Sequence, residues 1–267
     1  MRYLILFLLL FQSPGWCGEG NATSGMILPT HTKVAYGPDP MQFVNVWLAK
    51  SEAPTPVLVM IHGGGWCGGN VDEVLKEEGY LSRGISVVSV EYRRTPGSPL
   101  PAPVMDAARA VQFIRSKAGE WNLDKTKLAL LGGSAGACTS LWLAFHDDLA
   151  DPDSEDPVSR ESTKPLCVVA SNAQTSIDPP VIREWIGEEV LKHGMIFLAA
   201  GEPDTAAMLA NYEKHKPLYE KFSPVNHLDA SDPPAFLVYG GATKLPAENA
   251  GQAIHHPAFG LRLRRRQ

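Results

Sequence analysis

Short apolar runs alternate with longer amphipathic segments along most of the chain. The runs at 56–63 (PVLVMIHG) and 85–92 (ISVVSVEY) consist of branched apolar residues without polar alternation. Strands that are buried on both faces have this composition, and they belong to parallel sheets covered by helices. Amphipathic segments at 71–84 and 101–122 predict helices between such runs. The pattern therefore predicts an α/β domain with a mostly parallel sheet and helices on both faces.

The first elements of the domain have a different pattern. The segments at 32–37 (TKVAYG) and 43–50 (FVNVWLAK) are separated by the turn residues PDPM. Two short strand-like runs around such a turn predict an antiparallel hairpin at the start of the domain.

The region from about 179 to 221 interrupts the alternation. It lies between predicted strands at 165–173 and 233–241, and it contains the helical patterns PPVIREWIGEEVLKHG and DTAAMLANYEKHKPLYEKF. Helices inserted over the carboxyl edge of a parallel sheet commonly form a lid or one wall of a substrate pocket. We therefore expect one domain over 30–267 with a helical insertion at about 179–221.

Residues 1–20 are unlike the rest of the chain. Arg2 precedes an apolar run from Leu4 to Phe11, and small or turn-forming residues follow it. The run is too short for a membrane-spanning helix, which needs about 20 apolar residues, but it matches the core of a secretory signal. We expect a signal peptide at 1–20, no stable membrane span, and a secreted or periplasmic protein. Lipid anchoring at Cys17 is the weaker alternative, because the preceding residue is a large tryptophan.

Composition restricts the partners. The chain has 267 residues, 44% of them hydrophobic, and a formal net charge of -5. This length fits one large domain, and a surface that binds nucleic acid needs an excess of basic charge. We therefore expect a small-molecule ligand and no nucleic acid, while the oligomeric state is left open.

Cysteine usage favours neither a disulfide framework nor a zinc site. Apart from Cys17, the chain contains Cys67, Cys138 and Cys167, and an odd number does not form a framework. Buried free thiols are favoured, with a bridge between Cys67 and Cys138 as the alternative. The chain has no C-x-x-C pair and no H-E-x-x-H helix, so we expect no metal site.

A serine motif lies between a predicted strand and a predicted helix. Gly132, Ser134 and Gly136 form a G-x-S-x-G pattern inside LALLGGSAGA. In a nucleophile elbow the serine occupies a strained turn that raises its hydroxyl above the sheet, and the glycines let the neighbouring strand and helix pass closely. The position after a buried strand makes Ser134 the candidate nucleophile.

The glycine-rich stretch HGGGWCGGN at 62–70 directly follows another predicted strand. Acyl transfer develops negative charge on a carbonyl oxygen, and one backbone N–H held ready for that oxygen lowers the barrier by roughly 3 to 4 kcal/mol. Glycines leave their amides accessible, so Gly63, Gly64 and the amide of Ala135 form the candidate oxyanion hole. A plain strand-end turn would account for one or two glycines only. We expect His62 to brace this loop.

These motifs and their order resemble the α/β-hydrolase esterases and lipases related to hormone-sensitive lipase, including acetyl-esterase-like and feruloyl-esterase-like bacterial members. The resemblance covers about Tyr36 to Gly241 and also includes EYRRTPGSPLPAPVMDAARAVQFIRSKA and FSPVNHLDASDPPAFLVYGG. It implies the α/β-hydrolase fold and hydrolysis of a carboxylic ester through an acyl-serine intermediate, without a metal or organic cofactor. It also implies a structural role for Asp106.

The acid and the base depart from the pattern of this family. The resemblance implies an aspartate shortly after the strand at 233–241, and Thr243 stands there. Glu248, the nearest later carboxylate, is the candidate acid. The rest of the chain predicts a helical segment without a further strand, so we expect His255 and His256 to be surface or packing residues. In a further alternative one of the two folds back as the base, and His256 is retained as that candidate.

Two explanations fit this departure. In the first, the chain is a C-terminally truncated or frameshifted esterase. In the second, it is a degenerate hydrolase that binds an ester or acyl ligand, or serves as a scaffold, without turnover. The sequence therefore predicts a carboxylic-ester hydrolase of the esterase/lipase kind and leaves its competence open.

Overall fold

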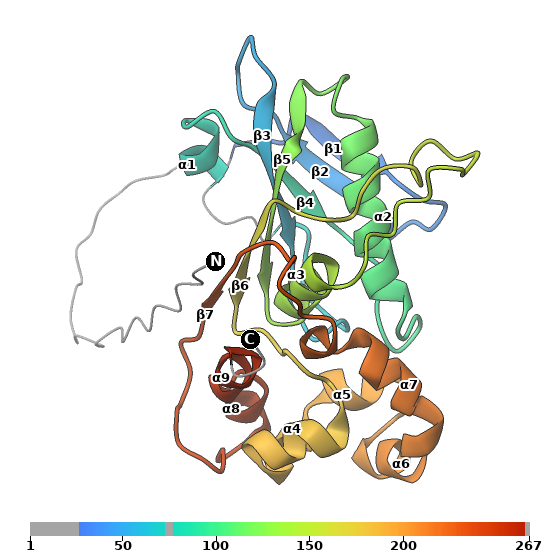
Figure 1. Ribbon diagram of the computed structural model, residues 1–267, viewed down its shortest axis with the longest axis vertical. Helices are drawn as coiled ribbons and strands as arrows, with labels where there is room; N and C mark the ends of the chain where they lie inside the picture. Colours follow the sequence, from blue (N-terminus) through green and yellow to red (C-terminus); the bar gives the residue numbers. More distant parts are fainter. Residues whose placement is uncertain (1–26, 73–76, 265–267) are drawn as a thin grey trace, which may run out of the picture.

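The computed structural model describes residues 27–72 and 77–264, which form one seven-stranded sheet surrounded by helices (Figure 1). The strand order is β1-β2-β4-β3-β5-β6-β7. The strands are β1 (His31–Ala35), β2 (Phe43–Trp47), β3 (Thr55–Ile61), β4 (Ser86–Val90), β5 (Leu123–Gly133), β6 (Cys167–Ser171) and β7 (Ala235–Val238). Every neighbouring pair from β4 to β7 is parallel, so the predicted mostly parallel sheet is confirmed.

The antiparallel part of the sheet lies at its start. β1 pairs antiparallel with β2, and β2 pairs antiparallel with β4. The predicted N-terminal hairpin is therefore confirmed, and it extends the parallel sheet on the side away from the serine motif.

Helices lie on both faces of the sheet, as predicted. Figure 1 shows α2 (Ala102–Ser116) and α3 (Ala135–Phe145) on one side and the short α1 (Glu77–Leu81) on the other. The main core lies under α2 and α3, and four apolar residues on one face of α2 are buried in it: Val104, Ala108, Val111 and Ile114. A smaller cluster on the face of α1 contains Trp47, Leu58, Met60 and Val87.

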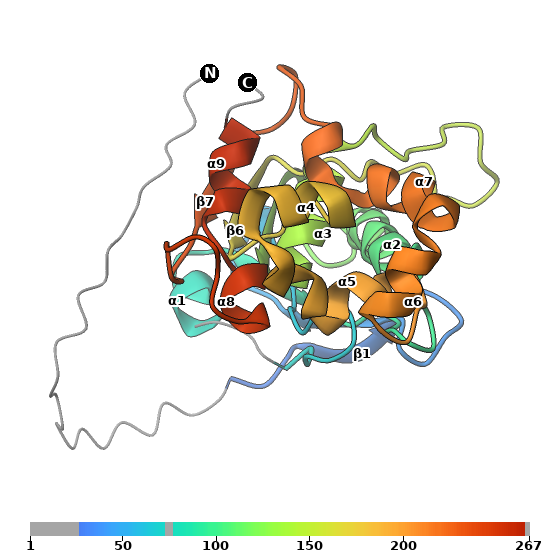
Figure 2. The same ribbon diagram turned by 90° about the horizontal axis from the view of Figure 1, so that it is seen from below.

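The region predicted to be a helical insertion contains a series of short helices between β6 and β7. They are α4 (Pro179–Ile186), η1 (Glu188–Lys192), α5 (Gly194–Ala199), α6 (Thr205–Ala210), α7 (Tyr212–Phe222) and η2 (Pro224–Asn226). Figures 1 and 2 show α4 and α5 beyond the carboxyl ends of the central strands, beside α8 (Ala250–Ile254) and α9 (Ala258–Arg264). This arrangement places helices around the end of β5, where the serine motif lies.

The segment that follows β6 holds the C-terminal helices in place. Gln174 donates from Nε2 to the carbonyl of Ile254 at 2.6 Å, and Thr175 donates from Oγ1 to the carbonyl of Phe259 at 2.8 Å. Both Gln174 and Thr175 are completely buried. Because one contact reaches the end of α8 and the other reaches α9, the two helices are fixed to the carboxyl edge of the sheet.

The three described cysteines are free thiols. Cys138 is buried and Cys167 is half-buried, whereas Cys67 is exposed, so the expectation of a buried thiol is wrong for Cys67. The Sγ of Cys67 donates to the carbonyl of Gly64 at 3.3 Å. The alternative bridge between Cys67 and Cys138 is not formed.

The predicted signal peptide at 1–20, together with Cys17, falls outside the described residues. Within the described ranges no helix combines the length and the apolar character needed to cross a membrane.

Candidate active site

Ser134 occupies a strained turn between β5 and α3. Its φ is 51° and its ψ is -120°, a backbone conformation that costs free energy for a residue with a side chain. The surrounding structure holds this conformation, because the Ser134 N–H donates to the carbonyl of Ser171 at 2.8 Å and the Ser134 carbonyl accepts from the N–H of Cys138. The turn has the geometry that the serine motif predicted.

The glycines of the serine motif are required by close backbone packing. A Cβ on Gly136 would collide with the carbonyl oxygen of Ile61 at the end of β3, and a Cβ on Gly132 would collide with the carbonyl oxygen of Gly136. The strand and the helix can therefore pass each other only because both positions lack a side chain.

The glycine loop after β3 lies directly against the serine turn. A Cβ on Gly63 would be 2.8 Å from the carbonyl oxygen of Gly133 and 3.4 Å from the Cβ of Ser134. Gly64 and Gly65 have φ values of 94° and 64°, in the region that favours glycine. The loop thus reaches Ser134 by a path that side chains would obstruct.

Two of the three predicted oxyanion donors, Gly63 and Ala135, lie beside this turn. Among the described residues, the N–H groups of Gly63 and Gly64 donate no hydrogen bond to the protein. Ala135 is the first residue of α3, where backbone N–H groups have no partner inside the helix. The structure therefore brings Gly63 and the N-terminus of α3 to the two sides of Ser134.

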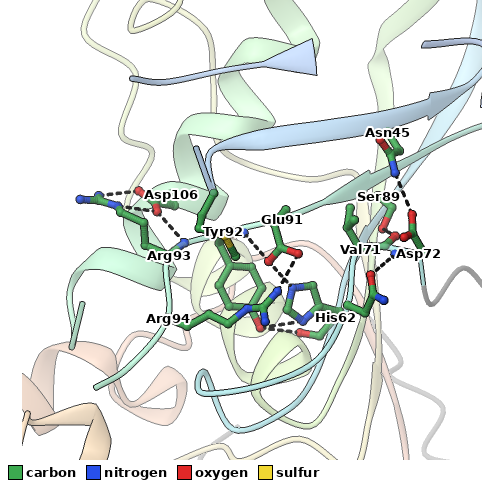
Figure 3. A network of polar contacts seen from close by, with 12 residues as sticks. Asn45, His62, Val71, Asp72, Ser89, Glu91, Tyr92, Arg93, Arg94 and Asp106 are labelled. Atoms are coloured by element: carbon green, nitrogen blue, oxygen red, sulfur yellow. Dashed lines mark hydrogen bonds and ion pairs between the residues drawn. The ribbon is translucent and has the colours of Figure 1, made fainter. Parts of the chain in front are cut away.

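A buried polar network anchors the start of the glycine loop (Figure 3). His62 Nε2 donates to Glu91 Oε1 at 3.0 Å, and the His62 ring stacks on Tyr92 with ring centroids 4.2 Å apart. Burial acts to raise the pKa of Glu91, but hydrogen bonds from His62 and Arg94 outweigh it and lower the pKa to about 2. Since Glu91 stays ionised, it can hold both partners, and His62 is placed to brace the loop as expected.

Asp106 belongs to a neighbouring part of the same framework (Figure 3). Its carboxylate accepts from Arg93 Nε at 2.8 Å and from Gln42 Nε2 at 2.6 Å. These contacts join α2 to the residue before β2 and to the segment after β4, which supports the structural role expected for Asp106.

His255 is the histidine that lies at the serine. Its Nε2 is 2.9 Å from Ser134 Oγ, although the two residues are 121 positions apart in the sequence. The residue follows α8 and is half-buried. Burial lowers the pKa of His255 below its ordinary value, while a backbone hydrogen bond to Gly251 acts in the opposite direction. A neutral imidazole therefore faces the serine hydroxyl near neutral pH.

The predicted base His256 lies elsewhere. Its ring is buried, and Nδ1 accepts from the N–H of Ala258 at 3.0 Å, which places the ring against the start of α9. Burial lowers the pKa of His256, and the nearby carbonyls of Lys244 and Thr243 oppose this effect. The candidate His256 is thus replaced by His255, because successive residues after α8 point in different directions.

The predicted acid Glu248 is also away from the base. It is exposed and pairs with Lys244 at 3.2 Å, and no contact between Glu248 and His255 exists among the described residues. Thr243 is exposed as well. The loop is therefore not shifted in the way that an acid role for Glu248 requires, and His255 has a backbone hydrogen bond to Gly251 instead.

Gln174 is a site residue that sequence reasoning missed. Its hydrogen bond to the carbonyl of Ile254 fixes the residue immediately before His255. The signal that could have revealed it is a polar run, SNAQTS at 171–176, directly after the carboxyl end of a buried strand. Side chains at that edge of a parallel sheet commonly face the functional site.

Comparisons with known proteins identify the family. The family profile described as BD-FAE matches residues 45–255. Esterase LipC of Mycobacterium tuberculosis is 24% identical over 231 residues, which cover 82% of this chain and 52% of LipC. The chain therefore spans about half the length of that relative. Carboxylesterase NlhH of the same species is 37% identical over 92 residues, covering 33% of this chain and 28% of NlhH.

A solved structure supports the fold assignment. The acetyl ester-xyloside bifunctional hydrolase from Caldicellulosiruptor lactoaceticus has a TM-score of 0.68 and 22% identity, covering 91% of this chain and 84% of that chain. At this identity the likeness shows the fold alone. The resemblance to α/β-hydrolase esterases seen in the sequence motifs is confirmed by these matches.

Proposed function

Because the chain belongs to the BD-FAE family of α/β-hydrolase esterases, we propose that it hydrolyses carboxylic esters with Ser134 as its nucleophile. The observation that carries this proposal is the 2.9 Å contact between Ser134 Oγ and His255 Nε2. A serine hydroxyl is a weak nucleophile until an adjacent base takes its proton. The strained serine turn and the glycine loop beside it supply the remaining parts of an acyl-transfer site.

The reaction follows from the positions of these groups. His255 Nε2 takes the hydroxyl proton of Ser134 as Oγ attacks the ester carbonyl carbon, and negative charge develops on the carbonyl oxygen. The N–H groups of Gly63, Gly64 and Ala135 stabilise that oxygen. His255 then returns the proton to the leaving alcohol, which gives an acyl-serine. Water, activated by the same imidazole, releases the acid and restores Ser134.

Among the residues that the structure describes, the orienting group of His255 is a backbone carbonyl rather than a carboxylate. With Nε2 at Ser134, the nitrogen that can donate to the Gly251 carbonyl is Nδ1. A carboxylate at this place would also stabilise the imidazolium that forms in the transition state, and disabling it in a serine protease lowers kcat by about 10⁴-fold. We therefore expect measurable but slow turnover compared with a complete triad.

This missing charge favours a second candidate function. A chain that retains the glycine loop and Ser134 but lacks a carboxylate at its base can serve as an acyl-ligand or ester-binding protein. In this role the ligand would raise the thermal unfolding temperature, and no product would form.

Small esters are the substrates that we propose for the first function, and export through a signal peptide at 1–20 is proposed for the protein. The names of LipC and NlhH describe esterases, which supports the reaction class. The site needs no cofactor for the steps given above.

Hydrolysis of p-nitrophenyl acetate and p-nitrophenyl butyrate tests the proposal, with Ser134→Ala as the control. We expect the substitution to reduce kcat by about 10⁴-fold or more, or to the background rate if turnover is slow. A fluorophosphonate probe should label the unchanged protein and not the variant. Equal rates in both proteins, together with a ligand-dependent rise in Tm, would instead support the binding function.

A further inference from the structure

We propose that His193 is a positioning residue that donates a hydrogen bond from Nε2 to an oxygen atom in the alcohol portion of the ester. The inference rests on the proposed ester hydrolysis. It extends that function by assigning a second histidine to the site and by defining a class of preferred substrates, esters whose alcohol carries an ether or hydroxyl oxygen.

The first line of evidence is the contact between α5 and the glycine loop. His193 immediately precedes α5, and a Cβ on Gly65 would be 3.7 Å from His193 Cε1 and 3.3 Å from Met195 Cβ. These are ordinary or tight van der Waals distances, so the imidazole lies against the loop that carries the oxyanion donors.

The second line of evidence is the position of His193 relative to the base. The rings of His193 and His255 are 6.5 Å apart between centroids and meet at an interplanar angle of 60°. His255 in turn contacts Ser134. The ring of His193 therefore borders the site between the glycine loop and His255.

The hydrogen bonds of His193 determine what it can offer a ligand. Its Nδ1 accepts from the N–H of Met195 at 3.2 Å, so the proton of the neutral ring resides on Nε2. Among the described residues no hydrogen bond uses this Nε2. Burial lowers the pKa of His193, and the neighbouring His255 lowers it further. A half-buried neutral imidazole thus presents one N–H donor for which no described residue supplies an acceptor.

The direction of the reaction indicates which part of the substrate this donor meets. The carbonyl oxygen is held by the glycine loop, and the leaving oxygen must lie near His255 because it receives its proton from that residue. His193 lies beside both the glycine loop and His255, so it borders the alcohol portion of the ester. A neutral N–H there discriminates between an oxygen and a methylene at the same place, since the oxygen accepts a hydrogen bond and the methylene does not.

A matched pair of esters tests this assignment. 2-Methoxyethyl acetate and n-butyl acetate have alcohol chains of equal length and differ by one oxygen in place of a methylene. We expect the unchanged protein to prefer the methoxyethyl ester by about tenfold in kcat/KM, measured as acetate release at pH 7.5, the size of effect that one hydrogen bond supplies.

Two substitutions separate positioning from helix capping. His193→Asn retains a side-chain acceptor for the Met195 N–H but no longer reaches the site, so the preference should fall to about onefold. His193→Gln gives up the cap and retains a donor on a longer side chain, so it should keep a preference of about threefold. His31→Asn in β1 is the matched control, and its preference should equal that of the unchanged protein.

The proposal fails if the unchanged protein shows no preference for the methoxyethyl ester or if His193→Asn retains that preference. A stricter form of the second result is that His193→Asn retains the preference while His193→Gln abolishes it. The last result would assign His193 to capping alone. Failure of the proposed function is distinct, because both esters would then react no faster with the unchanged protein than with Ser134→Ala.

Discussion

The serine turn and the glycine loop are built from the ends of β5 and β3, two parallel central strands in direct contact, whereas His255 lies between two short helices near the end of the chain. Backbone packing fixes the first region so tightly that Gly136 has no space for a Cβ. The second region depends on a few buried hydrogen bonds, such as that between Gln174 and the carbonyl of Ile254. One part of the site is therefore held by the sheet, and the other by side chains that reach across from another segment.

Because of this difference, substitutions in the two regions should have different effects. A change in the strand ends displaces rigid backbone, so it should affect both folding and the oxyanion donors. A change in the contacts of the C-terminal helices should displace the base and leave the sheet intact. Five predictions test the contrast.

Loss of the base should have the largest effect. His255→Ala removes the group that takes the proton of Ser134, and we expect kcat for p-nitrophenyl acetate to fall by about 10² to 10³-fold, less than in a complete triad because turnover is already slow without the carboxylate. Because the ring is half-buried and at the edge of the fold, Tm should change little. A variant with more than a tenth of the original kcat would show that another group acts as the base.

Filling the gap between the two strand ends should have the next largest effect. The new Cβ in Gly63→Ala would lie 2.8 Å from the Gly133 carbonyl oxygen, so the loop must move, together with the N–H groups proposed as oxyanion donors. We expect kcat to fall by about 10²-fold. Gly119→Ala is the matched control, since nothing lies within 4 Å of its Cβ. Unchanged kcat in Gly63→Ala would remove this loop from the mechanism.

Loosening the C-terminal region should lower activity by a smaller amount. Gln174→Leu leaves the Ile254 carbonyl without its donor, next to His255, and we expect kcat to fall about tenfold because the base is less well oriented. Thr175→Val removes the contact to Phe259 on α9 and should lower Tm with little change in kcat. Similar kcat values for the two variants would contradict a specific link between Gln174 and the base.

The acid limb of the kcat/KM profile should lie at a modestly lower pH than an ordinary histidine would give. Burial places the pKa of His255 below the ordinary histidine value of about 6.5. The neutral form is the active base, so activity is lost as pH falls through this lowered pKa, and kcat/KM at pH 6.5 should exceed half of its plateau. A profile with its acid midpoint above 6.5 would show that the base carries a stabilising negative neighbour.

Removal of the predicted acid should have the smallest effect. Glu248 is exposed and pairs only with Lys244 among the described residues, so Glu248→Gln should leave kcat within about twofold. A loss of more than tenfold would restore Glu248 to the site and require the loop to rearrange in solution.

The same contrast explains what the sequence could predict. The strand runs, the hairpin and the helices on both faces follow from local periodicity. The serine turn and the glycine loop can also be predicted from the sequence, because their backbone conformations and close packing require glycine at particular positions. Their arrangement against one another follows from the pairing of β3 with β5.

The base could not be identified in this way. His255 and His256 are adjacent and chemically identical, and only the long-range contact from Gln174 and the packing of His256 against α9 distinguish them. No local pattern records such contacts. The choice of Glu248 failed for a related reason, since proximity in sequence does not bring an exposed carboxylate to a base.

Cys67 gives the glycine loop a chemical handle. Its thiol is exposed and contacts the carbonyl of Gly64, while the other described thiols are buried or half-buried. Burial raises the pKa of Cys138 and of Cys167, so both resist alkylation. Among the described thiols, a maleimide dye would therefore attach to Cys67, beside the proposed oxyanion donors, and its emission would follow a substrate entering the site in real time.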